Sequence, residues 1–246
     1  MIIGVNGYAG SGKDTVGTII QYLLCPSHNR NESLQDILKE PSYHEWWLED
    51  ESEWEIQKWA GKLKVVASIL TGIPVEKFED QEFKKTNLGP EWSFLKMKPG
   101  KRQDGIFPKK VDMDIAFMTV RDLLQKLGTD ACRDNLHYNT WVNALMADYK
   151  KELSECGTSK KGTVVKCSKY PNWIITDTRF PNEADAIKNA GGILIRVERP
   201  GVKPINDHPS EVGLDHWTFD YVINNDGDLE SLSNKVKDIL IKEQIM

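Results

Sequence analysis

The chain of 246 residues is long enough for one large α/β domain that carries insertions, or for a core with a small lid. Its formal net charge of −5 argues against broad binding to nucleic acid, and no apolar run approaches the ~18 residues needed to cross a membrane. The four cysteines lack Cys-x-x-Cys spacing, which favours a reducing cytosol and argues against structural zinc.

An apolar run, Ile2–Val5, predicts a buried first strand that leaves no room for a signal peptide. The glycine-rich segment Gly7–Thr15 follows, and the apolar positions of Thr15–Leu24 then recur at helical spacing. A strand, a glycine-rich turn and a helix form the context in which the pattern G-x-x-x-x-G-K binds phosphate. Backbone N–H groups and the helix N-terminus would hold phosphate oxygens, and Lys13 would reach the terminal phosphates. We therefore expect ATP or GTP to bind here.

The loop departs from its usual form directly after the lysine. Asp14 stands where Ser or Thr normally binds magnesium, and the hydroxyl comes one residue later, at Thr15. This G-K-x-T order is similar to the loops of nucleoside monophosphate kinases, which phosphorylate small acceptors. Asp14 could contact magnesium through water, or it could favour the helix N-terminus electrostatically. A glycine-rich turn without a ligand is the alternative interpretation.

Two segments of the first half have no clear periodicity, and we interpret them as insertions. The first, at about 26–55, is polar at first and then acidic with interleaved tryptophans at Glu45–Trp54. We expect these indoles to pack on the core, and a partner site is the alternative. The second, at 84–112, is rich in Lys, Gly and Pro, so it is a solvated basic loop or a flap that closes over phosphates. Between them we expect a short strand at Glu55–Ala60 and a helix at Leu63–Leu70 that ends at Gly72.

The segment Thr119–Gly128 has the clearest helical pattern, with apolar residues at i, i+3, i+4 and i+7. We expect Gly128 to end this helix and Thr129 or Asp130 to cap a second one. The two helices carry side chains that suit a phosphate and a base edge: Arg121, Gln125 and Arg133. Solvated helix faces carry the same residue types, so both interpretations stay open.

The run Trp173–Asp177 is apolar and ends in an acid. This pattern is typical of a buried parallel strand whose C-terminal end faces a site. Asp177 could hold magnesium through water there, with Arg179 two residues later, or it could be a structural cap. The preceding segment Lys150–Lys169 is polar, with a turn expected at Lys160–Gly162, and it is a second candidate for a lid.

Four further elements complete the pattern: a helix at Asn182–Ala190, strands at Ile193–Val197 and Tyr221–Ile223, and a helix at Leu229–Ile241. Strands that alternate with helices predict a three-layer α/β/α fold of the P-loop type with a doubly wound parallel sheet. We expect one domain over 1–246, with helical and loop insertions for the acceptor and the lid. The role of His208 and Glu211 stays open, because Ser210 between them could cap a helix.

Five blocks of the chain, in order, resemble the deoxynucleoside monophosphate kinases of tailed bacteriophages. They are Gly10–Thr15, Ala60–Lys64, Thr119–Asp130 with its continuation through Arg133 to Val142, Asp177–Glu183, and Ile223–Glu230. The third block is the most specific, and together the blocks cover most of the chain. The resemblance weakens over 26–55 and 84–112, where no residues are transferred.

The resemblance implies a P-loop kinase that uses Mg²⁺ to move the γ-phosphoryl group of ATP to the 5′-phosphate of a deoxynucleoside monophosphate. The ATP phosphates would be held by Gly10, Ser11, Gly12, Lys13, Asp14 and Thr15, with the turn of Asn225 and Gly227 near the adenine. The acceptor site would be lined by Lys64, Arg121, Gln125, Arg133 and Trp141. Magnesium would be organised by Thr15 and Asp177. Charge on the transferred group would be neutralised by Lys13, Arg133 and Arg179.

Other functions remain open from the sequence. A different small-acceptor P-loop kinase, acting on adenylate or dephospho-coenzyme A, is one alternative. A nucleotide-binding regulator is another, although such switches normally keep Ser or Thr directly after the lysine. The resemblance is compatible with a homodimer and with the cytoplasm of an infected bacterium, and we expect neither a nucleic-acid partner nor a membrane. Which base is accepted is not readable from residue spacing.

Overall fold

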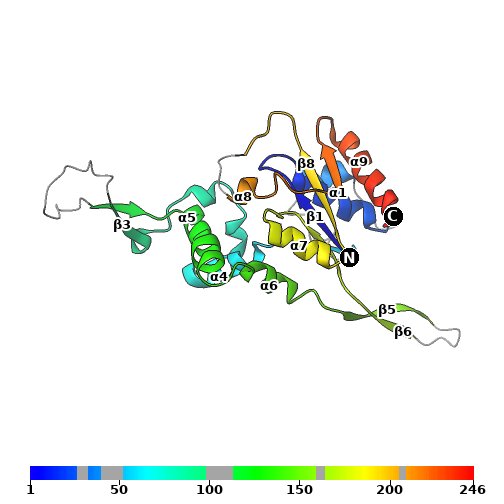
Figure 1. The fold of residues 1–246 in the computed structure, drawn as a ribbon, viewed down its shortest axis with the longest axis horizontal. Coiled ribbons are helices and arrows are strands. Elements are labelled where there is room, and N and C mark those ends of the chain that lie inside the picture. The colour runs from blue at the N-terminus through cyan, green and yellow to red at the C-terminus, as the bar shows by residue number, and fades with distance from the viewer. Residues whose placement is uncertain (27–32, 40–51, 98–112, 159–163, 205–208) are drawn as a thin grey trace. The chain divides into compact units, whose positions relative to one another are not determined.

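The computed structural model describes residues 1–26, 33–39, 52–97, 113–158, 164–204 and 209–246 (Figure 1). They divide into a sheet unit, Met1–Trp59 with Trp141–Met246, and a helical unit, Ala60–Thr140. Parts of the two expected insertions lie outside the described residues, at 27–32, 40–51 and 98–112. One domain with insertions therefore stays a prediction.

The sheet unit is built on a five-stranded sheet in which every neighbouring pair of strands is parallel. In spatial order the strands are β2 (Trp54–Gln57), β7 (Asn172–Ile175), β1 (Ile2–Asn6), β8 (Ile193–Glu198) and β9 (Tyr221–Asn224). Each strand overlaps one expected from the sequence. The predicted doubly wound parallel sheet is thus confirmed.

Helices cover both faces of this sheet, as a parallel sheet requires. One face carries α1 (Lys13–Leu24) and α9 (Leu229–Lys242), and α2 (Leu34–Lys39) lies beside α1. The other face carries α6 (Thr140–Met146) and α7 (Pro181–Asn189). A short helix, α8 (Pro209–Val212), precedes β9. No helix within the described residues is long and apolar enough to cross a membrane.

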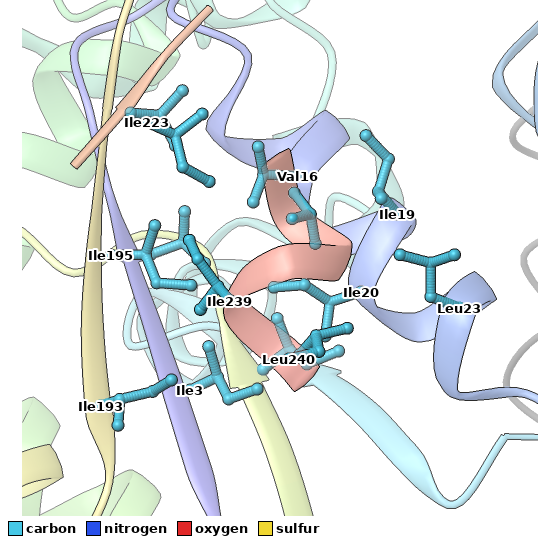
Figure 2. Close-up of a cluster of buried hydrophobic side chains, with 14 of the residues drawn as sticks. Ile3, Val16, Ile19, Ile20, Leu23, Ile193, Ile195, Ile223, Ile239 and Leu240 are labelled. Carbon is cyan, nitrogen blue, oxygen red and sulfur yellow. The ribbon is translucent and has the colours of Figure 1, made fainter. Parts of the chain in front are cut away.

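The strands bury alternate side chains against the two helical layers, because successive residues of a strand point to opposite faces. Ile3, Ile193 and Ile195 pack against α1 and α9 in the cluster of Figure 2. Their neighbours Ile2 and Leu194 pack against α6 and α7. The register of the strands thereby fixes which residues stand at the sheet's carboxyl edge, where the candidate site lies.

An antiparallel hairpin of β5 (Glu152–Thr158) and β6 (Val164–Lys169) belongs to the same unit. The sequence predicted only a polar segment here, and the expected turn at Lys160–Gly162 lies outside the described residues. Cys167 on β6 is disulfide-bonded, whereas Cys25 and Cys132 are free. The disulfide at Cys167 differs from the prediction, made from cysteine spacing, that the cysteines lie in a reducing environment.

The helical unit is organised around α4 (Gly61–Thr71) and α5 (Val120–Gln125). Its small core joins these helices through buried residues: Ala67, Phe78, Val120 and Leu123. Short 3-10 turns, at Val75–Phe78, Phe83–Lys85 and Pro90–Trp92, connect α4 to the hairpin of β3 (Ser93–Met97) and β4 (Met113–Phe117). Strand β3 falls in the segment expected to be a loop, because its alternation is short and its partner strand comes later in the chain.

The chain does not break after α5, and this corrects the prediction that Gly128 ends a helix and that Thr129 or Asp130 caps the next. A π-helix continues directly from Lys126 to Asp134. Gly128 is buried within it, and a Cβ at this position would come within 2.9 Å of Cδ2 of Leu63. The glycine therefore permits close packing of two helices, and its role is not termination. The predicted start is right, because Thr119 and Asp122 form a capping box.

Candidate active site

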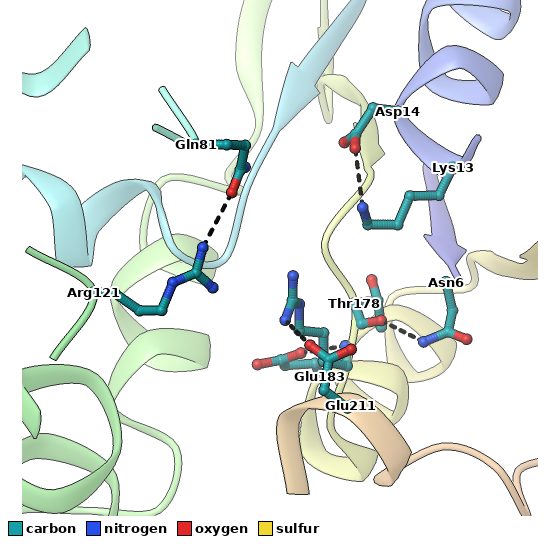
Figure 3. Close-up of polar contacts among 9 residues, drawn as sticks. Asn6, Lys13, Asp14, Gln81, Arg121, Thr178, Glu183 and Glu211 are labelled. Carbon is teal, nitrogen blue, oxygen red and sulfur yellow. Dashed lines mark hydrogen bonds and ion pairs between the residues drawn. The ribbon is translucent and has the colours of Figure 1, made fainter. Parts of the chain in front are cut away.

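The carboxyl edge of the central strands brings together the two motifs that the sequence placed far apart. The glycine-rich loop leaves β1, and Asp177 follows β7, which pairs with β1 in parallel register. A hydrogen bond joins the two segments directly: the Nδ2 of Asn6 donates to the carbonyl oxygen of Thr178 at 2.7 Å (Figure 3). Ligands of open α/β sheets bind at this edge, so the candidate site lies here.

The loop has the backbone of a phosphate cradle. Gly10 and Gly12 have φ angles of 83° and 95°, a region that favours glycine, and the N–H of Ser11 donates to the carbonyl oxygen of Tyr8 at 3.1 Å. The space beside Gly10 is open, with no atom of the described residues within 4 Å of where a Cβ would lie. The Oγ of Ser11 is buried and has no hydrogen-bond partner among those residues. An anion with several oxygens fits this loop.

Lys13 begins α1 and binds its own neighbour. Its Nζ lies 2.9 Å from Oδ2 of Asp14, as Figure 3 shows. Desolvation by surrounding atoms would raise the pKa of the Asp14 carboxyl, but the charge and hydrogen bond of Lys13 outweigh it, so this pKa lies below its ordinary value. Asp14 is therefore ionised at neutral pH and holds the ammonium group beside the loop.

Asn225 supports the backbone of the loop. Its Nδ2 donates to the carbonyl oxygen of Ser11 at 2.9 Å, and a Cβ on Gly12 would come within 2.5 Å of the same nitrogen. The turn after it is held by Lys235, whose Nζ binds the carbonyl oxygen of Asn224 and Oδ1 of Asp226, each at 2.7 Å. The side chain expected near an adenine thus fixes the phosphate loop, and the predicted contact of Asn225 and Gly227 with the base stays a prediction.

Asp177 is positioned by a residue that sequence reasoning missed. Its Oδ1 accepts a hydrogen bond from the backbone N–H of Trp59 at 2.8 Å. The indole of Trp59 is buried and donates to Oγ1 of Thr178 at 3.2 Å. Because Trp59 follows β2 and Asp177 follows β7, its parallel neighbour, the contact is a consequence of the sheet. No sequence signal marks it, since the two residues are 118 positions apart.

Arg179 is held by two glutamates. The carboxylate of Glu183 accepts the backbone N–H groups of Arg179 and Phe180 at 2.7 and 3.1 Å, which fixes the start of α7. The guanidinium Nη1 of Arg179 lies 3.1 Å from Oε1 of Glu211. Figure 3 shows both carboxylates beside this segment. Glu183 was missed, and the Glu-at-N3 pattern of a capping box could have found it.

The helical unit carries four of the residues predicted for the acceptor, and three of them make contacts within that unit. Lys64 is buried on α4 and pairs with Glu79. Arg121 donates to Oε1 of Gln81 at 3.4 Å (Figure 3). Arg133 is buried in the π-helix and lies over the ring of Tyr138 at 5.5 Å.

The other two predicted acceptor residues differ in exposure. Gln125 is exposed at the end of α5, one turn after Arg121, as the predicted helix requires. Trp141 is buried near the start of α6 and belongs to the sheet unit. The acceptor roles of all five residues stay predictions. His208 lies outside the described residues.

The residues present fit a magnesium ion that is bound together with phosphate. Across the part of the chain that the structure describes, no group of three or more His, Cys, Asp or Glu side chains could hold a metal alone. Mg²⁺ typically takes one or two protein ligands and completes its shell with water and substrate phosphates. Thr15, in the first turn of α1, and Asp177 are oxygen ligands of the right kind at the edge where phosphate would lie.

Comparisons with known proteins agree with this geometry. The family model for deoxynucleotide monophosphate kinase matches residues 101–236. The deoxynucleotide monophosphate kinase of Enterobacteria phage T4 is 37% identical over 122 residues, 50% of this chain and 45% of that protein. The corresponding kinase of Escherichia phage RB69 is 30% identical, with the same shares. The deoxynucleoside-5′-monophosphate kinase of Escherichia phage T5 is 23% identical over 239 residues, 87% of this chain and 85% of that protein. The chain thus spans about half the length of the first two relatives.

Proposed function

The chain belongs to the deoxynucleotide monophosphate kinase family, and on this premise we propose that it transfers the γ-phosphoryl group of ATP to the 5′-phosphate of a deoxynucleoside monophosphate. The products are the deoxynucleoside diphosphate and ADP. The observation that carries the proposal is the open phosphate loop, with the buried Ser11 hydroxyl, joined through Asn6 to the segment that holds Asp177 and Arg179.

The nucleotide side is assigned to the loop. Backbone N–H groups of Gly10 to Thr15 bind the ATP phosphates, and Lys13 exchanges its contact with Asp14 for the terminal phosphate oxygens. Thr15 and Asp177 would hold Mg²⁺, which would supply neutralisation of the phosphate charge. Asp177 is aimed by the Trp59 N–H, whose hydrogen bond fixes one carboxylate oxygen.

Bringing a monophosphate against a triphosphate is repulsive, so the reaction needs converging cations more than covalent chemistry. Arg179 and Arg133 join Lys13 in this role, because a guanidinium can bind phosphate oxygens through two parallel hydrogen bonds. On the acceptor side, Lys64, Arg121 and Arg133 bind the 5′-phosphate, and Gln125 and Trp141 contact the base. The exposed ends of Arg121 and Gln125, one turn apart on α5, support that assignment.

The setting of the reaction follows from its substrates. Free nucleotides are the only partners the mechanism needs, so we place the enzyme in the cytoplasm of an infected bacterium without a nucleic-acid or membrane partner. The relatives from bacteriophages support this placement. A homodimer remains part of the proposal, and sedimentation of the purified chain tests it.

The test is a coupled assay of ADP release with ATP and Mg²⁺ against dAMP, dGMP, dCMP, dTMP and the corresponding ribonucleotides. We expect strong stimulation by at least one deoxynucleotide, which also reveals the base preference. Dephospho-coenzyme A in the same panel separates this kinase from a different small-acceptor enzyme. ADP release that no acceptor stimulates would overturn the proposal and indicate a nucleotide-hydrolysing regulator.

A further inference from the structure

One short segment of the sheet unit, residues 209–217, carries two carboxylates that contact residues of the phosphate loop and of the segment after β7. It comprises α8 and the turn that follows, and Leu214 anchors it in the core that underlies α7. Glu211 and Asp215 stand four residues apart on either side of this anchor. Glu211 binds Arg179, which is a residue of the site. Asp215 binds Arg196, whose guanidinium lies over the ring of Tyr8 in the loop.

The first contact is between Glu211 and Arg179. The guanidinium Nη1 lies 3.1 Å from Oε1, the Glu211 side chain is only 13% exposed, and that of Arg179 is 40% exposed. The carboxylate is therefore fixed in the protein while the guanidinium reaches toward solvent. Glu183 holds the backbone of the same arginine. Backbone and side chain of Arg179 are thus oriented independently before any substrate binds, which is how a cation is preorganised for charge that develops later.

The second contact runs from Asp215 to the phosphate loop. Oδ1 of Asp215 accepts from the hydroxyl of Tyr8 at 2.7 Å and from Nη2 of Arg196 at 3.2 Å. Arg196 is 6% exposed, lies over the Tyr8 ring at 4.5 Å and donates to Oδ1 of Asn6. Because the carbonyl oxygen of Tyr8 accepts the N–H of Ser11, this network reaches the loop backbone itself.

The hydrogen bond to Asp215 also affects the acidity of Tyr8. Burial, and then the hydrogen bond to Asp215, raise the pKa of the Tyr8 hydroxyl above its ordinary value, although Arg196 acts against them. The hydroxyl therefore keeps its proton and remains a donor to the carboxylate. Charge-assisted hydrogen bonds of this kind are about twice as strong as neutral ones.

We propose that segment 209–217 is a positioning element of the active site, in which Glu211 aims the guanidinium of Arg179 and Asp215 fixes the start of the phosphate loop through Tyr8 and Arg196. The Glu211 half rests on the proposed kinase function. The Asp215 half requires only that the loop binds a nucleotide. Neither carboxylate needs to touch substrate, and the two halves have different kinetic signatures.

The Glu211 half is tested by Glu211→Gln, which keeps the shape and removes the charge. We expect kcat to fall about 10- to 100-fold, by comparison with small misplacements of catalytic groups, while both KM values change less than about twofold. In an Arg179→Ala background, Glu211→Gln should lower kcat no further, because Glu211 acts through that arginine. Glu53→Gln removes an exposed carboxylate that pairs with Lys169 and serves as the matched control.

A purely structural Glu211 gives a different result. It would lower kcat by the same factor in both backgrounds, together with the melting temperature, and that outcome would overturn this half. Glu211→Asp keeps the charge on a shorter side chain, and we expect it to retain more kcat than Glu211→Gln. Less activity in the Asp variant than in the Gln variant would also contradict the proposal.

The Asp215 half is tested by calorimetric titration of MgATP into Asp215→Asn. We expect Kd to rise about 10-fold, the equivalent of one charge-assisted hydrogen bond. Tyr8→Phe removes only the hydroxyl, so it tests the same link if Asp215→Asn does not fold. It should raise Kd about threefold, and the two changes combined should fall short of the product of their effects. Glu198→Gln is the control, because that exposed carboxylate lies 3.8 Å from Nε of the same Arg196.

The outcomes separate this proposal from the kinase assignment. If no acceptor stimulates ADP release but Asp215→Asn weakens MgATP binding, the kinase assignment fails and the positioning of the loop stands. If transfer is normal but Asp215→Asn and Tyr8→Phe, both folded, bind MgATP like the wild type, the positioning element is refuted alone. A wild-type chain that binds no MgATP overturns both.

Discussion

In the sheet unit, Asp177 and the backbone of the phosphate loop are held by partners far away in the sequence, whereas Lys64 and Arg121 of the helical unit are held by partners 15 and 40 positions away. Trp59 and Asp177 are 118 positions apart, and Asn225 reaches across 214 positions to Ser11. In the helical unit, Lys64 pairs with Glu79 only 15 positions away. The nucleotide side of the site can therefore form only when the whole parallel sheet has formed.

The two units also differ in how they bury apolar surface. The sheet unit has fully buried isoleucines on both faces of its central strands, among them Ile2 and Ile174. In the helical unit, α4 leaves Val65, Ile69 and Leu70 exposed. The long-range contacts of the candidate site thus lie in the unit with the larger apolar core. Substitutions at Lys13, Asp177 and Asn225 of the sheet unit should then act on phosphoryl transfer and nucleotide binding, and a substitution at Arg121 of the helical unit on acceptor binding.

The largest effect is expected from Lys13→Ala. Loss of this ammonium group removes a cation that no other residue of the loop replaces, so kcat should fall on the order of 10³-fold or more, by comparison with arginine fingers. Steady-state ADP release measures it, and circular dichroism checks that the chain still folds. Lys39→Ala, which removes an exposed lysine on α2, is the control. Full activity in Lys13→Ala would refute the assignment of the loop.

A smaller effect is expected from Asp177→Asn. The amide oxygen can still accept the Trp59 N–H, so the fold is kept while the charge toward magnesium is lost. The Mg²⁺ concentration for half-maximal rate should rise about 10- to 100-fold. Asp185→Asn, on the exposed face of α7, is the matched control. An unchanged Mg²⁺ titration would show that Asp177 is only a structural cap.

Arg121→Ala tests the helical unit directly. Loss of a charge-assisted hydrogen bond to the acceptor phosphate should raise the acceptor KM about 10-fold and leave the ATP KM unchanged. Arg121→Lys keeps the charge without the planar guanidinium, so its acceptor KM should lie between those of the wild type and Arg121→Ala. Initial rates over a grid of both substrates separate the constants. An effect confined to ATP would move Arg121 out of the acceptor site and break the division between the units.

The smallest effect is expected from Asn225→Ala. It removes one hydrogen bond to the Ser11 carbonyl, worth about 1 kcal/mol, so the ATP KM should rise about fivefold with little change for the acceptor. Asn224→Ala is the control, because Lys235 binds the backbone carbonyl oxygen of Asn224, which the substitution keeps. If the size of the effect depends on whether ATP or GTP is the donor, Asn225 contacts the base and does not act only through the loop.

The sequence was sufficient for features that depend on short spacing. The glycine-rich loop is recognisable because Gly10, Gly12 and Lys13 stand at fixed positions between an apolar strand and a helix. The apolar run that ends at Asp177 likewise marks a buried parallel strand, and the sheet confirms it. These patterns reflect local backbone geometry and burial. Both are determined by residues that lie only a few positions apart in the sequence.

The rest depends on contacts that no local pattern encodes. Gly128 has the position of a helix terminator, yet it packs on Leu63 within a continuous π-helix. A terminating glycine and a packing glycine look alike until the neighbouring helix is placed. Glu211 and Asp215 have the composition of a solvated turn, and only the fold brings them to Arg179 and Tyr8.

The most direct measurement follows the γ-phosphorus of labelled ATP after incubation with the chain, Mg²⁺ and each deoxynucleoside monophosphate. Chromatography separates inorganic phosphate from nucleoside diphosphates. We predict that the label moves to the diphosphate of at least one deoxynucleotide and that Lys13→Ala abolishes this transfer. Label that appears only as inorganic phosphate, at a rate independent of the acceptor, would contradict it.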